Sequence, residues 1–410
     1  MAEAGYPRLS AADKARFLPG YQALIQRLKR SSEAPRGFPG SMPVTLSRRH
    51  LRMLHDADYL VLEKSDGVRY LLYATEQAVL LLDRRLDAYA VVPYPVLIMP
   101  DGSLHAGTLL DGELVRNQRT GQYEYLVYDV LAVQGDVEIA RQDYRVRLDA
   151  IERYATFPRS LHPATAGCLR IRCKDVYEKG ELPLLFSRIQ QRHVVAADDD
   201  DDDDCGGGGI GEYRYEHLRA DGVLSNGNDG LVFTPVKLPY TLRTCTALLK
   251  YKYPTHHTVD FTLWLEGDSG GHDVHTFLGY RSENGITRYR EVYFPTRRKR
   301  AWFADYSQWH ECIIECTYDR QAGEWRYLRR RTDKESPNYA SVVMDCLEAI
   351  AESIPCEELL QRVTDGSPAP CASADKTAPG RDLFDAANAD YTRSTPMSPY
   401  PPPVQSAVPP

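Results

Sequence analysis

The stretch Glu63-Lys64-Ser-Asp-Gly-Val-Arg69 joins two short apolar runs, 59–63 and 69–74, which are rich in Leu, Val and Tyr. Asp-Gly is a turn signal, so the pattern predicts a lysine that ends one strand and an arginine that begins the next. An amine must be neutral to act as a nucleophile, and its usual pKa of about 10.4 must therefore fall. The alternative for Lys64 is a surface lysine beside a hairpin turn.

Five other stretches also place charged or aromatic side chains in or beside predicted strands. Each stretch alone is explained by a core residue, an edge strand or a solvated basic face. Together they supply cations for phosphate, carboxylates for a metal or a ribose, and an aromatic plate for a base, which are the requirements of nucleotidyl transfer. The stretches are Leu109-Leu-Asp111-Gly-Glu113-Leu114, Tyr125-Leu-Val-Tyr128-Asp129, Asn228-Asp229-Gly230-Leu231, Leu248-Leu-Lys250-Tyr-Lys252 and Trp325-Arg-Tyr-Leu-Arg-Arg-Arg331-Thr-Asp333-Lys334.

Length and composition favour a folded chain of two or three domains, because 410 residues exceed one ordinary core and 43% of them are apolar. The net charge is −7, and Asp198–Asp204 alone supplies seven negative charges, so the balance says little about partners. No run of 18 apolar residues is present, and we expect no membrane span. Nine cysteines, an odd number, fit a reducing compartment.

We expect an α+β fold in which antiparallel sheets with flanking helices are followed by a five-stranded barrel of the OB type. Predicted strands cover 59–63, 69–74, 78–83, 108–115, 123–133, 230–236 and 259–266, and the first three form a meander. Predicted helices cover 47–54, 142–154 and 341–354. The expected domains are a loose extension (1–35), a catalytic domain (36–255) with a disordered Asp/Gly loop (196–210), an OB domain with a C-terminal helix (256–362) and a disordered Pro-rich tail (363–410).

The six stretches, in this order and at these separations, resemble the covalent nucleotidyltransferase superfamily of mRNA capping enzymes and polynucleotide ligases. The details are most similar to GTP:RNA guanylyltransferases of the fungal single-function type. Val259-Asp260-Phe261, the block that ends in Arg331-Thr-Asp333-Lys334 and the lead-in Phe38-Pro-Gly-Ser-Met-Pro-Val44 carry this resemblance, which spans residues 35 to 360.

The resemblance implies a two-step reaction. Lys64 would attack the α-phosphate of GTP to give a lysyl–GMP, and the GMP would then pass to the 5′-diphosphate end of nascent RNA to form the GpppN cap. By position, the implied contacts are Arg69 and Glu113 to ribose, Arg84 to phosphate, Tyr128 and Lys174 to guanine, Lys250 and Lys252 to the α-phosphate, Asp229 to a divalent metal, and Arg331, Asp333 and Lys334 to the β,γ-phosphates. Cys173 stands where the family has proline before Lys174.

The resemblance also implies a metal cofactor and partners. We expect Mg²⁺ or Mn²⁺, 5′-diphosphate RNA, a separate RNA 5′-triphosphatase subunit, the phosphorylated C-terminal domain of RNA polymerase II, and a nuclear location. No cysteine precedes Cys168, so we expect no N-terminal cysteine phosphatase. The alternatives are an ATP-dependent polynucleotide ligase and a non-catalytic scaffold that binds RNA or polymerase. The arginine-rich segment 281–300 is either an RNA-binding face or a solvated loop.

Overall fold

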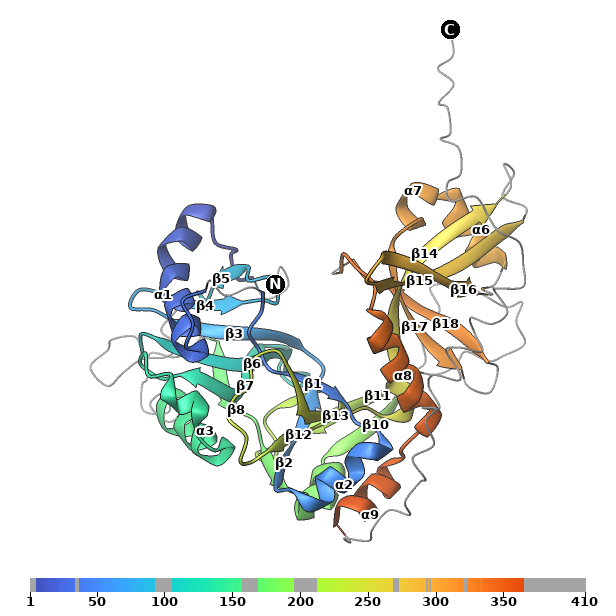
Figure 1. The fold of residues 1–410 in the computed structure, drawn as a ribbon. Coiled ribbons are helices and arrows are strands. Elements are labelled where there is room, and N and C mark those ends of the chain that lie inside the picture. The colour runs from blue at the N-terminus through green and yellow to red at the C-terminus, as the bar shows by residue number, and fades with distance from the viewer. Residues whose placement is uncertain are drawn as a thin grey trace. The chain divides into compact units, whose positions relative to one another are not determined.

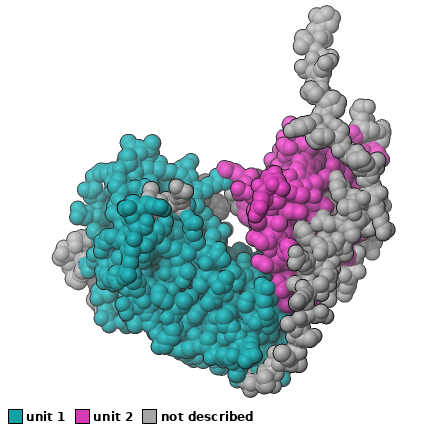
Figure 2. All heavy atoms as spheres, in the orientation of Figure 1, with its two compact units in different colours: residues 1–253, 355–370 teal, residues 254–354, 371–410 magenta. Residues whose placement is uncertain are grey.

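The structure is a computed structural model of the 410-residue chain, and it describes residues 5–33, 37–92, 105–156, 169–194, 212–267, 273–292, 294, 296–319, 323–332 and 334–364. The chain divides into two compact units (Figure 2). Unit 1 contains residues 1–253 and 355–370, and unit 2 contains residues 254–354 and 371–410. The Asp/Gly loop and residues 365–410 of the expected tail lie outside the described residues.

One sheet of unit 1, here called sheet A, carries most of the apolar core. Its strand order is β5-β4-β3-β6-β7-β8, and all pairs are antiparallel except β7 with β8. Buried side chains on both faces form two clusters, one of which includes Leu72, Leu110 and Val127 and the other Leu71, Leu109 and Leu131. The strands are β3 (Val68–Ala74), β4 (Val79–Leu82), β5 (Ala88–Ala90), β6 (Thr108–Arg116), β7 (Tyr123–Ala132) and β8 (Arg170–Cys173).

The second sheet of unit 1, sheet B, has seven strands in the order β1-β13-β12-β11-β10, with β2 paired to β12 and to β9 (Figure 1). The pair β1–β13 is parallel, so both sheets are mixed where the sequence predicted antiparallel sheets. The strands are β1 (Met42–Thr45), β2 (Tyr59–Ser65), β9 (Val176–Glu178), β10 (Ile189–Val194), β11 (Glu212–Leu218), β12 (Ser225–Pro235) and β13 (Thr244–Tyr251).

The segment between Lys64 and Arg69 crosses from one sheet to the other. The expected hairpin of β2 with β3 is wrong, because β2 pairs with β12 and β9 whereas β3 pairs with β4 and β6. Almost every position of β2 and β3 is buried. Each strand therefore lies inside a sheet with a covered face on both sides, which a two-stranded hairpin alone would not provide. Gly67 makes the crossing possible, since a Cβ there would press against the carbonyl oxygen of Leu114.

The N-terminal segment is ordered over 19 residues, although the sequence suggested a loose extension. Helix α1 (Ala11–Lys29) begins at a Ser10 cap and buries Tyr21, Leu24 and Ile25 against sheet A. Pro19 lies inside this helix and obscures its signal in the sequence. The other helical segments of unit 1 are α2 (Arg48–Asp56), η2 (Glu138–Arg141), α3 (Tyr144–Ile151), η3 (Glu152–Thr156), η5 (Lys179–Glu181), α5 (Leu182–Ser187) and α9 (Cys356–Thr364).

Unit 2 is built on a five-stranded antiparallel sheet in the order β16-β15-β14-β17-β18. The number of strands matches the expected OB type, whose closure into a barrel stays a prediction. An aromatic core with Phe261, Tyr289 and Trp325 holds the unit together. Its elements are η6 (Pro254–His256), β14 (Thr258–Gly267), β15 (Val274–Ser282), β16 (Gly285–Glu291), α6 (Thr296–Ala304), α7 (Tyr306–Trp309), β17 (Ile313–Asp319), β18 (Glu324–Arg330) and α8 (Ala340–Glu352).

Helix α9 differs from the domain limits expected from the sequence, which grouped residues 356–362 with the second domain. It belongs to unit 1, where Glu358 forms an ion pair with Arg48 of α2. Among the helices of the described ranges, none is both long enough and apolar enough to cross a membrane.

Candidate active site

Lys64 forms an ion pair with Asp229, and Lys252 binds the same carboxylate oxygen. The Lys64 amine donates to Asp229 Oδ2 at 2.5 Å, and the Lys252 amine lies 3.0 Å from that oxygen. The three residues are contributed by β2, by β12 and by the residue that follows β13. Their side chains are between 22% and 24% exposed, so solvent and substrates can still reach them.

A bulge in β12 places Asp229 at this point. The pairing of β12 with β2 is irregular between Asn228 and Leu231, and Gly230 has φ of +117°. A side chain at Gly230 would collide with the carbonyl oxygen of Tyr251, the last residue of β13. The bulge therefore requires glycine and turns the preceding carboxylate towards Lys64, which explains the Asp-Gly pair in the sequence.

The carboxylates around Lys64 hold its amine in the charged form. Burial alone would lower the pKa of Lys64, but the charges of Asp229 and Glu113 outweigh burial and raise this pKa above its usual value. Burial would likewise raise the pKa of Asp229, yet Lys64 and Lys252 lower it to about 2. Attack requires a neutral amine and therefore a lowered lysine pKa, so in this structure the Lys64 amine is paired and not yet nucleophilic.

A second buried group surrounds Lys174, which follows β8. The Lys174 amine donates to the backbone carbonyl of Glu63 at 3.1 Å and lies 3.3 Å from the Glu63 carboxylate and 4.0 Å from that of Glu113. It also lies 5.6 Å from the centre of the Tyr128 ring. Three predicted site residues, Glu113, Tyr128 and Lys174, are thus brought together, and Glu63 is an addition that the sequence argument missed.

Arg69 is engaged by Asp111, a carboxylate with no exposed surface. The guanidinium donates to both carboxylate oxygens of Asp111, at 3.0 and 2.6 Å, and to the Ser41 carbonyl at 2.8 Å. Asp111 also accepts hydrogen bonds from the hydroxyls of Tyr128, at 2.9 Å, and Tyr240. Asp111 therefore links Arg69 to the Tyr128 hydroxyl, and neither Asp111 nor Tyr240 was given a role from the sequence.

Two other predicted residues of unit 1 lie apart from these contacts. Arg84 is exposed in the turn after β4, and within the described ranges no hydrogen bond or ion pair connects it to Lys64 or Lys174. Lys250 is half-buried in β13, where it pairs with Val232 of β12.

Unit 2 has a comparable pairing of cations around Asp260. Arg331 donates to Asp260 Oδ1 at 2.9 Å, and the Lys334 amine donates to Oδ2 of the same carboxylate. Glu315 lies 3.5 Å from Arg331 and accepts from Arg329 at 2.7 Å. Asp260 belongs to the motif Val259-Asp260-Phe261, for which no role was predicted, and Asp333 lies outside the described residues.

The donor set fits a divalent ion that is held mainly by a substrate. Among the residues that the structure describes, no group of three or more His, Cys, Asp or Glu side chains could hold a metal by itself. Mg²⁺ is commonly bound by one or two carboxylates together with phosphate oxygens and water. Asp229 meets that requirement, because it is partly exposed and lies beside the predicted nucleophile Lys64 and the predicted phosphate contact Lys252.

Two family models match this chain: "mRNA capping enzyme, catalytic domain" over residues 8–192 and "mRNA capping enzyme, C-terminal domain" over residues 256–360. The chain is 32% identical to mRNA-capping enzyme subunit alpha of Schizosaccharomyces pombe, over 80% of this chain and 81% of that protein. It is 27% identical to the subunits of the same name from Neurospora crassa (80% and 85% covered) and Saccharomyces cerevisiae (83% and 82% covered).

A solved structure, Chlorella virus DNA ligase-adenylate, has a TM-score of 0.29 and 12% identity, over 72% of this chain and all of that chain, and this level of similarity carries no conclusion about activity. The family assignment rests instead on the two matched models and on the fungal subunit that is 32% identical over most of both chains. The chain belongs to the mRNA capping enzyme family.

Proposed function

We propose that Lys64 is the nucleophile of the guanylyltransferase step of mRNA capping. Its amine nitrogen attacks the α-phosphorus of GTP, the bond to the β-phosphate oxygen breaks, and pyrophosphate leaves. The resulting Nζ–P bond is broken in turn by the terminal phosphate of 5′-diphosphate RNA, which forms GpppN and restores the free lysine. The observation that carries this proposal is the Lys64–Asp229–Lys252 arrangement, in which one carboxylate serves two amines.

Lys252 keeps the Asp229 carboxylate paired with a positive charge during the reaction. Lys64 must lose its proton before it attacks, and the loss would leave a largely buried carboxylate without a counter-ion. Lys252 stays 3.0 Å from Asp229 Oδ2 and keeps the carboxylate paired when Lys64 becomes neutral. The two lysines thus have different tasks, although the sequence presents both as cations.

Asp229 is also the residue that would hold Mg²⁺ or Mn²⁺. When bound, the ion shields phosphate charge and favours departure of pyrophosphate. Occupation of Asp229 by a cation weakens the hold of this carboxylate on the Lys64 proton, because Asp229 is a principal cause of the raised Lys64 pKa.

The nucleoside is the natural ligand of the Tyr128–Lys174 group. Tyr128 offers a ring whose position is fixed through Asp111, and Lys174 is a buried donor that reaches a guanine oxygen more readily than an adenine amino group. Glu113 is the candidate for ribose hydroxyls. Arg69, whose donors are used by Asp111 and Ser41, acts mainly by positioning Tyr128.

The remaining assignments follow the family. Arg84, Lys250, Arg331, Asp333 and Lys334 are candidates for phosphate contacts. The relatives are named as subunits of a capping enzyme, which implies an RNA substrate and partner subunits. We propose that these partners are a separate RNA 5′-triphosphatase and the phosphorylated C-terminal domain of RNA polymerase II, and that the chain acts in the nucleus.

The test is nucleotide selectivity in the first half-reaction. Purified protein with a divalent ion is incubated separately with α-labelled GTP and α-labelled ATP, and covalent label is measured after denaturation. The proposal requires label from GTP and little from ATP. Label from ATP alone would assign the chain to the ligase chemistry, and no label from either nucleotide would support a non-catalytic scaffold.

A further inference from the structure

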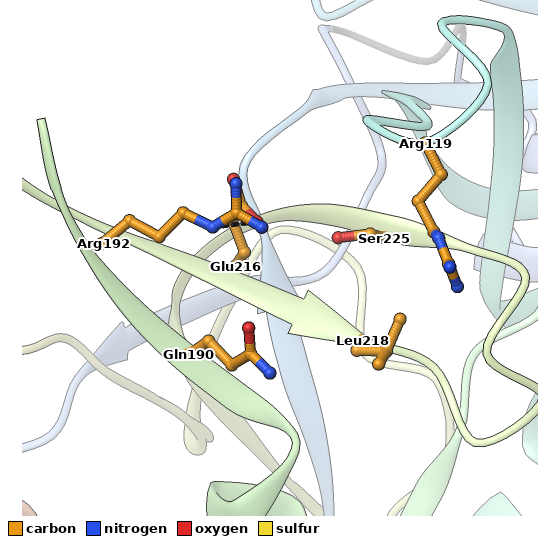
Figure 3. A pocket seen from close by; sticks show the side chains of 6 residues that line it. All are labelled: Arg119, Gln190, Arg192, Glu216, Leu218 and Ser225. Carbon is orange, nitrogen blue, oxygen red and sulfur yellow. Dashed lines mark ion pairs between the residues drawn. The ribbon is translucent and has the colours of Figure 1, made fainter.

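A pocket lined by two arginines lies on sheet B, outside the Lys64 group. It encloses about 210 Å³ between the β6–β7 turn and strands β10, β11 and β12. Figure 3 shows Arg119 and Arg192 on opposite sides of Ser225. The lining residues are Arg119, Gln190, Arg192, Glu216, Leu218 and Ser225.

Strand register places the pocket residues on one face of the sheet. Directly paired residues of antiparallel strands project to the same face, and so do residues two apart along a strand. Ser225 pairs with Leu218, and Gln190 pairs with Glu216, which is two residues before Leu218. Arg192 is two residues after Gln190, so β10, β11 and β12 all contribute to the same face.

Lys64 projects from that same face. Ser65 pairs with Asn228, so their neighbours Lys64 and Gly227 both lie on the opposite face from this pair. Gly227 is two residues from Ser225 and is therefore on the pocket face. Asp229 and Ser225 are four residues apart in β12, so at about 3.3 Å per residue the pocket lies about 13 Å along the strand from Asp229. Gly227 lies midway and has no side chain, and the Asp66 side chain packs over it, with its Cβ 3.1 Å from the point where a Cβ of Gly227 would stand.

The charges of the pocket suit a polyanion. Arg119 is exposed and bound to the Gly222 carbonyl, while Arg192 lies 2.9 Å from Glu216. Arg214 pairs directly with Arg192 across the β10–β11 ladder, so a third arginine projects from the same face beside the pocket. Glu216 opposes an anion, but the arginines outnumber it, and guanidinium groups bind phosphate through two parallel hydrogen bonds.

We propose that this pocket binds internucleotide phosphates of the acceptor RNA. The proposal rests on the function proposed above: the 5′-diphosphate end reacts beside Lys64, and the first nucleotides run along β12, past Asp66, to Arg119 and Arg192. None of the six lining residues has an aromatic side chain on which a base could stack, so the pocket reads the RNA backbone and not its sequence. Sequence-independent binding suits a reaction that any transcript must undergo.

The experiment separates the two half-reactions in the full-length chain. The variant Arg119→Gln/Arg192→Gln is compared with a matched double variant, Arg52→Gln/Arg153→Gln, which removes two exposed arginines of unit 1 that pair with Asp56 and Asp149. Adduct formation from GTP is measured first, because it needs no RNA and shows that the variant is folded. GMP transfer is then measured to a 5′-diphosphate single-stranded RNA and to a nucleoside 5′-diphosphate, which has no internucleotide phosphate.

The pocket variant is expected to raise the KM for RNA by about tenfold and to leave the KM for the nucleoside diphosphate unchanged. The slope of log KM against log salt concentration should fall by about 1.4, because each phosphate of a single strand that the protein neutralises adds about 0.7 to this slope. Glu216→Gln should change the KM for RNA in the opposite direction, because it frees Arg192. The matched control should behave as the unmodified protein.

An unchanged KM for RNA in the pocket variant would overturn the proposal, and so would an equal rise for both acceptors. An unmodified protein that forms no GMP adduct would instead overturn the proposed function, before RNA enters the experiment.

Discussion

Asp229 in unit 1 and Asp260 in unit 2 are each shared by two cations, but their surroundings differ. The Asp229 side chain is 22% exposed and its partners are two lysines, whereas the Asp260 side chain is 6% exposed and is bound by Arg331 and Lys334. Asp260 is further tied by its backbone to Asn338, which both donates to it and accepts from it. The first carboxylate is placed to release a cation, and the second is placed to retain two.

This difference follows from the burial of the carboxylate and from one partner, because both cations of Asp229 are lysines whereas Asp260 binds an arginine as well as Lys334. A lysine amine can lose its proton and become a nucleophile, whereas a guanidinium stays charged under all ordinary conditions. An exchangeable pair must remain open to solvent and substrate, because full burial would make a broken pair very costly. A retained pair gains orientation from burial. The two sites thus show the same ion-pair motif adapted to reaction and to positioning.

The largest expected effect is loss of the nucleophile. Lys64→Arg retains a cation for Asp229, but the guanidinium stays charged and cannot attack phosphorus as a neutral amine does. Covalent labelling by GTP should therefore disappear. Lys252→Arg is the matched control, because a counter-ion suffices at that position, and this variant should retain measurable label. Label of normal intensity in Lys64→Arg would show that another residue carries GMP.

A smaller loss is expected for the retained pair. Arg331→Ala removes a candidate phosphate contact and should slow adduct formation by about 100-fold, a typical cost for removing one group that stabilises transition-state charge. Arg326→Ala, which removes a partly exposed arginine of the same strand region paired with Asp319, is the control. Equal rates in both variants would exclude Arg331 from the reaction.

Replacing Asp260 and replacing Asp229 should change the free energy of unfolding by different amounts. Asp260→Asn should lower the unfolding free energy by about 1–3 kcal/mol, since its cations lose a buried partner. Asp229→Asn should cost less than Asp260→Asn, because the lysines of Asp229 are partly exposed and regain contact with solvent. All four tryptophans, at 264, 302, 309 and 325, lie in unit 2, so their fluorescence in urea follows Asp260→Asn, and circular dichroism follows Asp229→Asn. The reverse order of costs would contradict the comparison.

The smallest effect is expected from metal removal without nucleotide. A chelator should abolish GMP adduct formation yet shift the unfolding free energy by less than about 0.5 kcal/mol, because one carboxylate without phosphate oxygens holds Mg²⁺ weakly. Urea titrations with and without chelator measure this shift. A large loss of stability would point to a structural metal instead.

Much of the fold was predictable from local pattern. The strands around Lys64, Glu113, Tyr128 and Asp229 and the helix near residue 341 were found because apolar periodicity is a local signal. The partner of each strand was not, since periodicity does not say which strands pair, and the crossing at Gly67 was therefore read as a hairpin. Helix α1 was hidden by Pro19.

Site residues that belong to a short motif were predictable from the sequence. Contacts between segments that are far apart in the sequence were not. Lys64, Asp229 and Lys252 were named from short motifs, and the structure brings them together. Tyr240 binds Asp111 across 129 residues of sequence, and no local pattern announces such a contact. The effect of Asp229 on the Lys64 pKa was likewise not predictable from the motifs, because it depends on the pairing of β2 with β12.

The central claim is tested most directly by locating the nucleotide on the protein. The chain is treated with GTP and a divalent ion, digested under conditions that preserve phosphoramidates, and analysed by mass spectrometry. We expect the mass of GMP on the peptide that contains Lys64 and on no other peptide. GMP on Lys252 or Lys174 instead, or no adduct at all, would contradict the account.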